Sequence, residues 1–368
     1  MVYSIPRTLQ LVNPKWFPTY PYFISKNPLM KMEPEPPWAK NFRLDSKPRA
    51  NATLMSLVRN EELDDLLMTM ADVERTFNSK FNYPWTFIND KKFTKEFMKK
   101  TSAATNATVY YEIIPEEHWS QPSWIDSNLE EISAKQLEKE GVQYSKMGSY
   151  HRMCRWNSGL FYLHPRMLQF RWYWRVEPKT HYFCDIDYDV FRFMEDAGKI
   201  YGFVINLYDS PESIRGLWPT TLEFVASHRD YVHPNSAMGW LTQNTRPHHN
   251  DIAGYSTCHF WSNFEIGDME FWRSKVYQDY FDYLDHAGGF FYERWGDAPV
   301  HSVALGLFAD RDKIHWFKDI GYQHIPYFNC PQSPKCSGCI PGLFSDGTGL
   351  SPENCFPQWM KYGGITDF

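Results

Sequence analysis

The sequence lacks long hydrophobic runs. No stretch of its 368 residues reaches the roughly 18 apolar residues that a membrane-spanning helix needs. A charged segment followed by an apolar one, the pattern of a secretory leader, does not open the chain either. We therefore expect a soluble polypeptide.

Excess positive charge is also absent. The formal net charge is −6, from 38 basic and 44 acidic residues. Such a chain has no broad cationic field, which argues against nucleic acid or an anionic membrane surface as the main partner. Because the sequence has neither a G-x-G-x-x-G motif nor a Walker loop, bound phosphates would have to be held by a metal ion and side chains.

Aromatic residues, by contrast, are abundant. They make up 18% of the chain, with 15 Trp, 23 Tyr and 27 Phe. Their rings offer flat apolar faces with polar edges, which suit the C–H faces of sugars. Most of them are explained equally well as filling for the sizeable core that a chain of this length and 43% hydrophobic content can bury.

Cysteine is present in an odd number, seven, and four of these residues lie near the end of the chain. Either disulfides or a metal explains that crowding. Cys336 and Cys339 have the spacing of a zinc site, but no second ligand pair lies near them. Two glycosylation sequons, at Asn51 and Asn106, favour a secretory compartment.

The chain divides into two parts. Residues 1–50 contain nine prolines without a sustained period, which predicts an extended arm or stem. Residues 51–368 are expected to form a single catalytic domain. There, apolar runs of strand length alternate with helical patterns, so we predict an α/β fold with a mostly parallel sheet covered on both faces. The predicted strands are 53–58, 85–90, 108–114 and 201–209, and the predicted helices are 61–77, 129–141 and 269–288.

Ligands of such sheets sit beyond the carboxyl ends of the strands. Polar residues follow two of the predicted strands there: Arg59 and Asn60, with Asn60 as a possible helix N-cap, and Asn89 and Asp90. A third group of polar residues follows the segment "HYFC".

That third group contains Asp185, Asp187 and Asp189. If the segment is extended, the three carboxylates share one strand face, because successive side chains alternate. Such an arrangement can hold Mn²⁺ or Mg²⁺ against a diphosphate. A solvated strand end explains the same residues.

Glu265 stands in the aromatic stretch "CHFWSNFEI", and Asp297 lies in a Gly/Pro turn with aromatic neighbours. Burial among rings tunes a carboxylate for acid, base or nucleophilic work, and paired carboxylates serve both transfer and hydrolysis of glycosides. Alternatively, Glu265 caps the following helix or pairs with Arg273. His324, in another aromatic loop, could complete the coordination of a metal.

Several stretches together resemble one family, the fungal Golgi α-1,2-mannosyltransferases of glycosyltransferase family 15. The similar segments are "LVRN" (57–60), "SYHRMCR" (149–155), "YWRVEP" (173–178), "CDIDYD" (184–189), "CHFWSNFEI" (258–266), "GGFFYERWGDAPVHS" (288–302) and "DIGYQHIPYFNCP" (319–331). The resemblance implies a GT-A-like fold, GDP-mannose as donor, Mn²⁺ as cofactor, and transfer to a mannose acceptor on N- or O-linked glycans with retention of configuration.

The resemblance also implies roles for individual residues. Glu177 takes the place usually held by an Asp-x-Asp motif, and His324 joins it on Mn²⁺. Asp185 and Asp187 then become supporting or acceptor-side candidates. The residues expected at the nucleotide and its diphosphate are Arg59, Tyr150 and Arg175.

At the sugar, Glu265 matches the proposed nucleophile and Asp297 an expected neighbour. The resemblance predicts an asparagine-containing pair before Cys258, where this chain has Ser256 and Thr257. This departure concerns the residues expected at the acceptor.

Family members are type II membrane proteins of the Golgi lumen, so the resemblance predicts membrane contact only through an N-terminal anchor, and none precedes the proline-rich arm here. The alternatives to an α-1,2-mannosyltransferase are a mannosylphosphate or other hexose transferase on the same donor site, a glycoside hydrolase, and a mannose-binding module without catalysis.

Overall fold

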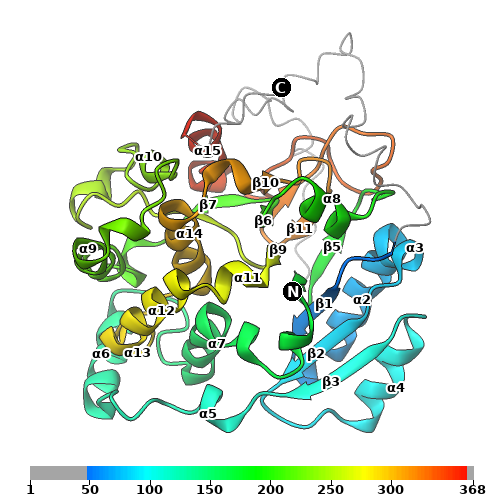
Figure 1. The fold of residues 1–368 in the computed structure, drawn as a ribbon, viewed down its shortest axis with the longest axis horizontal. Helices are drawn as coiled ribbons and strands as arrows, with labels where there is room; N and C mark the ends of the chain where they lie inside the picture. Colours follow the sequence, from blue (N-terminus) through cyan, green and yellow to red (C-terminus); the bar gives the residue numbers. More distant parts are fainter. Residues whose placement is uncertain (1–47, 363–368) are drawn as a thin grey trace.

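A seven-stranded sheet forms the centre of the computed structural model, which describes residues 48–362 (Figure 1). Its strand order is β10-β6-β9-β4-β1-β2-β3. In that order the strands are Ile314–Trp316, Tyr201–Phe203, Phe264–Asp268, Trp172–Val176, Ala52–Leu57, Trp85–Asn89 and Val109–Ile113. Strand β9 runs antiparallel to β4 and β6, and the other neighbouring pairs are parallel. The expected mixed, mostly parallel sheet is confirmed.

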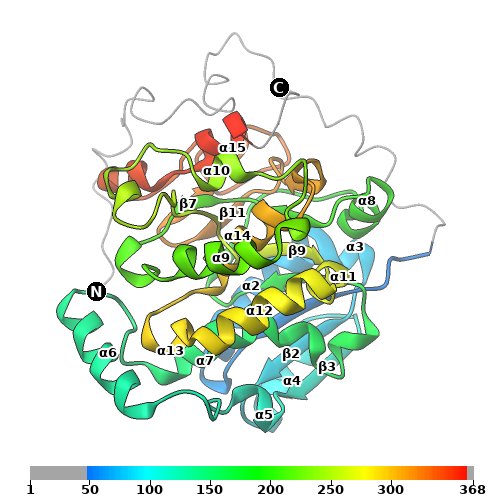
Figure 2. The same ribbon diagram turned by 60° about the vertical axis from the view of Figure 1, so that its left-hand side comes forward.

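Helices cover both faces of this sheet. One core joins it to α7 (Gly148–Gly159), α12 (Lys275–Ala287) and α14 (Asp297–Phe308), and the other joins it to α2 (Leu63–Val73), α4 (Lys95–Ala103) and α8 (Val190–Asp196). Side chains alternate along each strand, so Tyr173 of β4 enters the first core while Trp172 and Trp174 enter the second. Figure 2 shows α12 beside α9 (Leu217–Ser227) on the outside of the first core.

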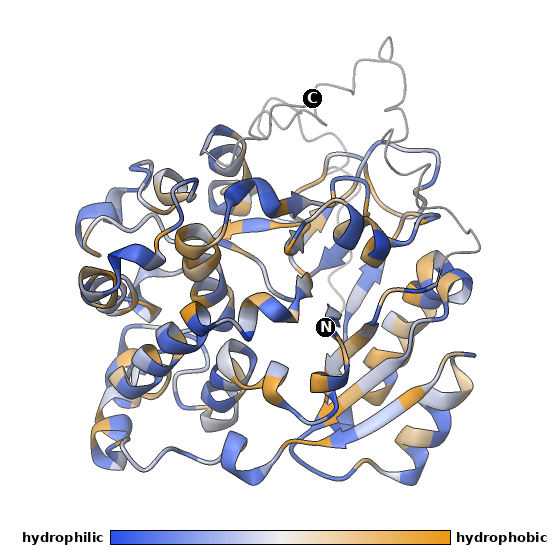
Figure 3. Ribbon diagram, in the orientation of Figure 1, coloured by the Kyte–Doolittle hydropathy of each residue, from blue (hydrophilic) through white to orange (hydrophobic). Residues whose placement is uncertain are grey.

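The remaining helices lie around these two layers. They are α3 (Ser79–Phe81), α5 (Glu116–Trp119), α6 (Ser127–Lys139), α10 (Met238–Leu241), α11 (Met269–Trp272), α13 (Gly289–Tyr292) and α15 (Phe356–Tyr362). Figure 3 shows that the peripheral α6 carries mostly hydrophilic residues. Helix α14, by contrast, is buried along nearly its whole length. No helix within residues 48–362 is long and apolar enough to cross a bilayer.

Two small sheets complete the fold. One consists of β12 (Tyr327–Asn329), β11 (Tyr322–His324) and β5 (Thr180–Tyr182), and the other of β7 (Asn206–Tyr208) and β8 (Cys258–Phe260). In the first, His324 lies opposite Thr180, whose Oγ1 donates to the Glu177 carbonyl at 2.8 Å. This pairing brings β11 to the carboxyl end of β4.

Three details of the predicted elements need correction. The strand predicted at 201–209 is divided, because β6 joins the large sheet and β7 a small one. The helix predicted at 269–288 is two helices, since Ser274 caps the start of α12, although it does end at Gly288, which has a φ of 78°. Asn60 is not an N-cap: its side chain instead accepts from the Thr94 amide and donates to the Lys92 carbonyl.

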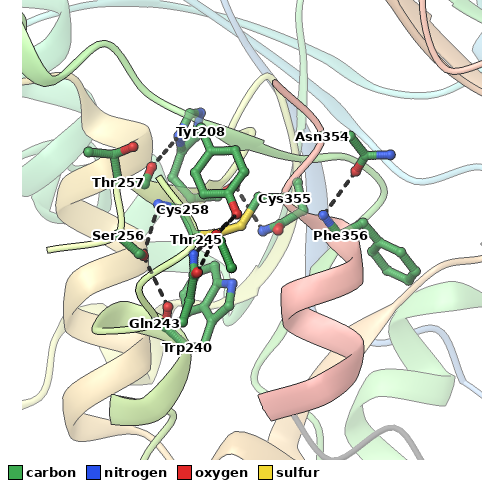
Figure 4. Close-up of a disulfide and its surroundings, with 12 residues drawn as sticks. Tyr208, Trp240, Gln243, Thr245, Ser256, Thr257, Cys258, Asn354, Cys355 and Phe356 are labelled. Carbon is green, nitrogen blue, oxygen red and sulfur yellow. Dashed lines mark hydrogen bonds between the residues drawn. A yellow bond between two sulfur atoms is a disulfide. The ribbon is translucent and has the colours of Figure 1, made fainter. Parts of the chain in front are cut away.

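Disulfides account for six of the seven cysteines. The pairs are Cys184–Cys336, Cys258–Cys355 and Cys330–Cys339. Figure 4 shows the second pair, which ties β8 to the segment that leads into α15. Cys154 is free and buried. Because Cys336 and Cys339 belong to different disulfides, they are not a zinc pair.

A proline-rich arm was predicted for residues 1–50. Of these, residues 1–47 lie outside the described part of the chain.

Candidate active site

The buried guanidinium of Arg175 joins three of the predicted acids. Arg175 on β4 lies opposite Glu265 on β9, so the two side chains are cross-strand neighbours on one face. Its Nε donates to Glu177 Oε1 at 2.6 Å and its Nη1 to Asp297 Oδ2 at 2.5 Å, while Nη1 lies 3.9 Å from Glu265 Oε1. Burial lowers the pKa of Arg175, but the negative charges of Asp297, Glu177 and Glu265 outweigh it and hold the pKa well above its ordinary value. The guanidinium therefore stays cationic.

Glu265 is the most deeply placed of these acids, with 1% of its surface exposed. Its Oε2 is 3.1 Å from the Tyr201 hydroxyl, which donates to it, and 3.1 Å from His301 Nδ1. The alternative roles are excluded, because Asp268 caps the following helix and the guanidinium of Arg273 donates mainly to backbone carbonyls.

Asp297 is the first residue of α14, where the helix dipole favours a negative charge. Ser262 Oγ donates to its Oδ2 at 2.6 Å, beside the bond from Arg175. Burial alone would raise the pKa of Asp297, but the positive charge of Arg175, the nearby imidazole of His301 and these hydrogen bonds hold it below its ordinary value. Asp297 is therefore a carboxylate at neutral pH.

Glu177 and His324 have the properties of metal ligands. Burial raises the pKa of Glu177 despite the opposing charge of Arg175. Burial, followed by the charge of Arg175, lowers the pKa of His324 to about 4, so its imidazole is neutral at pH 7. Its Nδ1 is buried and has no hydrogen-bond partner among the described residues. A neutral imidazole with an unpaired nitrogen suits a cation, although no group of three or more His, Cys, Asp or Glu side chains gathers around one point in residues 48–362.

Tyr150 and Arg59, both expected near the nucleotide, lie in different surroundings. Tyr150, on α7, stacks on Tyr144 with ring centroids 4.6 Å apart, and the guanidinium carbon of Arg294 lies 5.9 Å from its ring centre. Arg59 is exposed and pairs with Glu62 at 3.0 Å. In the described part of the chain its guanidinium contacts that acid rather than the Arg175 cluster.

The three aspartates of "CDIDYD" do not share a strand face, because the segment between β5 and α8 is irregular. Each has its own partner: Asp185 pairs with Lys80, Asp187 with Lys335 at 2.8 Å, and Asp189 caps α8. The prediction of a metal site formed by these three residues is therefore wrong. A supporting or acceptor-side role for Asp185 and Asp187 stays a prediction.

Sequence patterns did not indicate three residues of the site: Tyr201, Ser262 and His301. Tyr201 lies in a predicted strand and Ser262 in the aromatic stretch, and no sequence feature distinguishes either residue from its neighbours. His301 did carry a signal, because it lies four residues after Asp297 in a helix, a spacing that places two side chains on one face.

The family model described as glycolipid 2-alpha-mannosyltransferase matches residues 22–364. The chain belongs to this family. Among curated members, the probable mannosyltransferase KTR4 of Saccharomyces cerevisiae is 46% identical over 323 residues, which are 85% of this chain and 70% of the relative. The O-glycoside alpha-1,2-mannosyltransferase omh1 of Schizosaccharomyces pombe is 45% identical over 307 residues, 82% of this chain and 77% of the relative.

Solved structures of glycolipid 2-alpha-mannosyltransferase family members share the fold. Core-mannan synthase A (CmsA/Ktr4) from Aspergillus fumigatus, in its Mn/GDP form, is 55% identical with a TM-score of 0.87, covering 92% of this chain and 94% of that one. Ktr4p from S. cerevisiae, in complex with GDP, is 42% identical with a TM-score of 0.89, covering 92% of this chain and 89% of that one. The GT-A-like fold class expected from the sequence is thus confirmed.

Proposed function

We propose that this chain is a retaining α-1,2-mannosyltransferase that moves mannose from GDP-mannose to a mannose acceptor on N- or O-linked glycans. The observation that carries the proposal is the Arg175 cluster, in which one cation joins Glu177, Asp297 and Glu265 within a family whose relatives bind GDP and Mn. A donor diphosphate, a metal and a buried acid are the parts that retaining transfer needs.

The metal site consists of Glu177 and His324. The residues fit Mn²⁺, because a carboxylate oxygen and a neutral imidazole nitrogen with no other partner are both suitable ligands. When bound, Mn²⁺ would supply Lewis-acid stabilisation of the negative charge on the departing GDP.

Arg175 has two tasks in this proposal. It holds Glu177 and Asp297 in place through two different guanidinium nitrogens. It also provides a fixed positive charge near the site where the leaving group becomes more negative, which lowers the energy of the transition state. The exposed Arg59 and the half-buried Tyr150 would complete the nucleotide site.

Glu265 can serve either of two retaining routes. In the first, its carboxylate bonds to the anomeric carbon as the C–O bond to phosphate breaks, and the electron pair leaves with GDP. An acceptor hydroxyl then displaces the carboxylate and gives its proton to a phosphate oxygen of the departing GDP. In the second, its negative charge stabilises the oxocarbenium ion while the acceptor attacks on the side of the leaving group and gives its proton to the leaving phosphate. Both routes need the carboxylate beside the sugar.

The deciding experiment is incubation with GDP-mannose, Mn²⁺ and methyl α-mannoside, followed by linkage analysis. We expect an α-1,2-linked disaccharide from the wild type and a loss of turnover of at least about 1,000-fold in Glu265→Gln, with GDP binding unchanged. A phosphodiester product would indicate the alternative mannosylphosphate transferase. No turnover, together with mannoside binding that needs no GDP, would indicate a binding module.

A luminal location in the Golgi is part of the proposal. The three disulfides support an oxidising compartment, because such bonds form and persist along the secretory route. The two sequons at Asn51 and Asn106 favour the same route.

A further inference from the structure

We propose that His301 is a positioning residue for Glu265: together with Tyr201 it holds Oε2 of the carboxylate, so that Oε1 is the oxygen presented to the mannose. The inference rests on the proposed function, since it concerns the acid that this function places beside the sugar. It holds for both retaining routes, because each depends on where the carboxylate points.

The hydrogen bonds of the His301 ring are fixed at both ends. Nε2 lies 3.0 Å from the Asn157 carbonyl oxygen, which can only accept, so Nε2 must carry a hydrogen. Nδ1 lies 3.1 Å from Glu265 Oε2. One proton must therefore lie between Nδ1 and Oε2, either on the imidazole beside a carboxylate or on the carboxyl beside a neutral ring. In both descriptions the pair has no net charge.

The pair is also sealed from water. His301 has 0% of its surface exposed and Glu265 1%. The His301 ring stacks on Trp272, with centroids 4.2 Å apart, and the rings of Phe161 and Tyr277 lie near its edges at 6.3 and 6.1 Å. Such packing leaves the imidazole one orientation, so the ring acts as a rigid support for the carboxylate.

Oε2 receives a second hydrogen bond from β6, the strand that neighbours β9. The Tyr201 hydroxyl on β6 donates to it at 3.1 Å. Two donors on one carboxylate oxygen fix the rotation of the group. Oε1 then lies on the side of Arg175, 3.9 Å from its Nη1. That guanidinium also contacts Glu177 and Asp297, so Oε1 is turned toward the donor site.

The other ionisable groups around the pair come from each neighbouring element. They are Arg175 and Tyr173 on β4, Tyr201 on β6, Asp297 on α14 and Tyr277 on α12. Burial, followed by the charge of Glu265, raises the pKa of Tyr201 and Tyr173 well above the ordinary value, so both phenols remain protonated donors. Arg175 and Asp297 offset each other's charge.

The test uses His301→Gln and Tyr201→Phe in the full chain, with His164→Gln as the matched control. His164 is equally buried, at 2% exposure, and its two ring nitrogens contact the Ile113 carbonyl and the Arg166 amide rather than an acid. We expect His301→Gln to lower kcat about 100-fold, because the reacting oxygen is displaced, while KM for GDP-mannose and the thermal shift by GDP with Mn²⁺ stay within twofold. Tyr201→Phe should lower kcat by a smaller factor, and His164→Gln should retain kcat.

A double-variant comparison separates positioning from a structural role. If His301 acts through Glu265, His301→Gln has no further effect on the residual turnover of Glu265→Gln, whereas a structural role lowers kcat in both backgrounds alike. A kcat within threefold of the wild type in His301→Gln overturns the inference. Should that variant not fold, an unchanged kcat in Tyr201→Phe does the same. Failure of the proposed function is a different result, because the wild type would then make no α-1,2 product.

Discussion

His324, a residue of β11, is one of the two proposed metal ligands. Its backbone belongs to a small sheet in which it lies opposite Thr180 of β5, whose hydroxyl donates to the Glu177 carbonyl. We expect His324→Ala to raise the Mn²⁺ concentration needed for half-maximal activity about 10- to 100-fold and to weaken GDP binding in parallel.

The control for this prediction is His181→Ala. His181 lies beside His324 in the same small sheet, opposite Gln323, but its Nδ1 contacts Asp72 at 2.9 Å. Metal titrations followed by activity and by GDP-induced thermal shift should leave this variant unchanged. Identical titration curves for His324→Ala and the wild type would remove His324 from the metal site.

His315 makes the stability of the protein sensitive to acid. The ring lies between Phe193 and Phe317, with centroids 4.7 Å from each, and burial followed by the charges of Lys199 and Lys318 lowers its pKa to about 3. In the unfolded chain the ordinary value is about 6.5, so below that pH the unfolded state binds a proton that the folded state does not. Its contribution is complete above pH 6.5 and is lost as the pH falls toward 3.

Replacing this ring by Phe should therefore reduce the acid sensitivity. From pH 7 to pH 5, His315→Phe should lose up to about 2 kcal/mol less of its free energy of unfolding than the wild type does. Urea denaturation at both pH values measures the difference. Parallel losses in the two proteins would show that His315 does not take up the proton on unfolding.

At the scale of elements, α7 supports the site through its close approach to α12. Gly159, the last residue of α7, lies against Phe281: a Cβ there would be 2.0 Å from the ring. Gly159→Ala should therefore lower the free energy of unfolding by about 1 to 3 kcal/mol through overpacking. Gly148→Ala, at the first residue of the same helix, meets nothing within 4 Å and should be neutral or slightly stabilising. Equal effects of the two substitutions in urea denaturation would contradict the close packing.

Local sequence patterns predicted the elements that keep one hydrophobic period and belong to one sheet or one helix layer throughout. Strands β1, β2 and β3 and helices α2 and α6 could be predicted for this reason. The division at 204 and 205 could not, because Val204 and Ile205 are as apolar as the strands on either side and only pairing partners distant in sequence separate β6 from β7.

The candidate site shows the same limit. A buried acid at 265 was evident from its aromatic neighbours, and the resemblance supplied its role. Its hydrogen-bond partners were not evident, since Tyr201 and His301 lie 64 and 36 residues away in the chain. They meet only because β9 inserts antiparallel between β4 and β6 and α14 covers that face. The chemical role of a single residue can be predicted from the sequence here, whereas the contacts between the site residues depend on the topology of the sheet.

At the scale of the whole molecule, two disulfides constrain the C-terminal part to very different degrees. Cys258–Cys355 links residues 97 positions apart and ties β8 to the segment before α15, while Cys330–Cys339 closes a loop of 9. A cross-link removes more freedom from the unfolded chain when the loop it closes is longer. The long link should therefore contribute more to the stability of the whole fold.

Paired Cys→Ala substitutions test this argument. Removing Cys258 and Cys355 should lower the free energy of unfolding by about 5 kcal/mol, against about 2.5 kcal/mol for Cys330 and Cys339, from loop closure alone. Both Cys258 and Cys355 are fully buried, so the small voids left by alanine act in the same direction. Urea denaturation of the two double variants measures both losses relative to the wild type with its disulfides intact. An equal or larger loss for the short loop would show that local contacts around residues 330–339, and not the cross-linking of distant segments, hold the C-terminal part on the sheet.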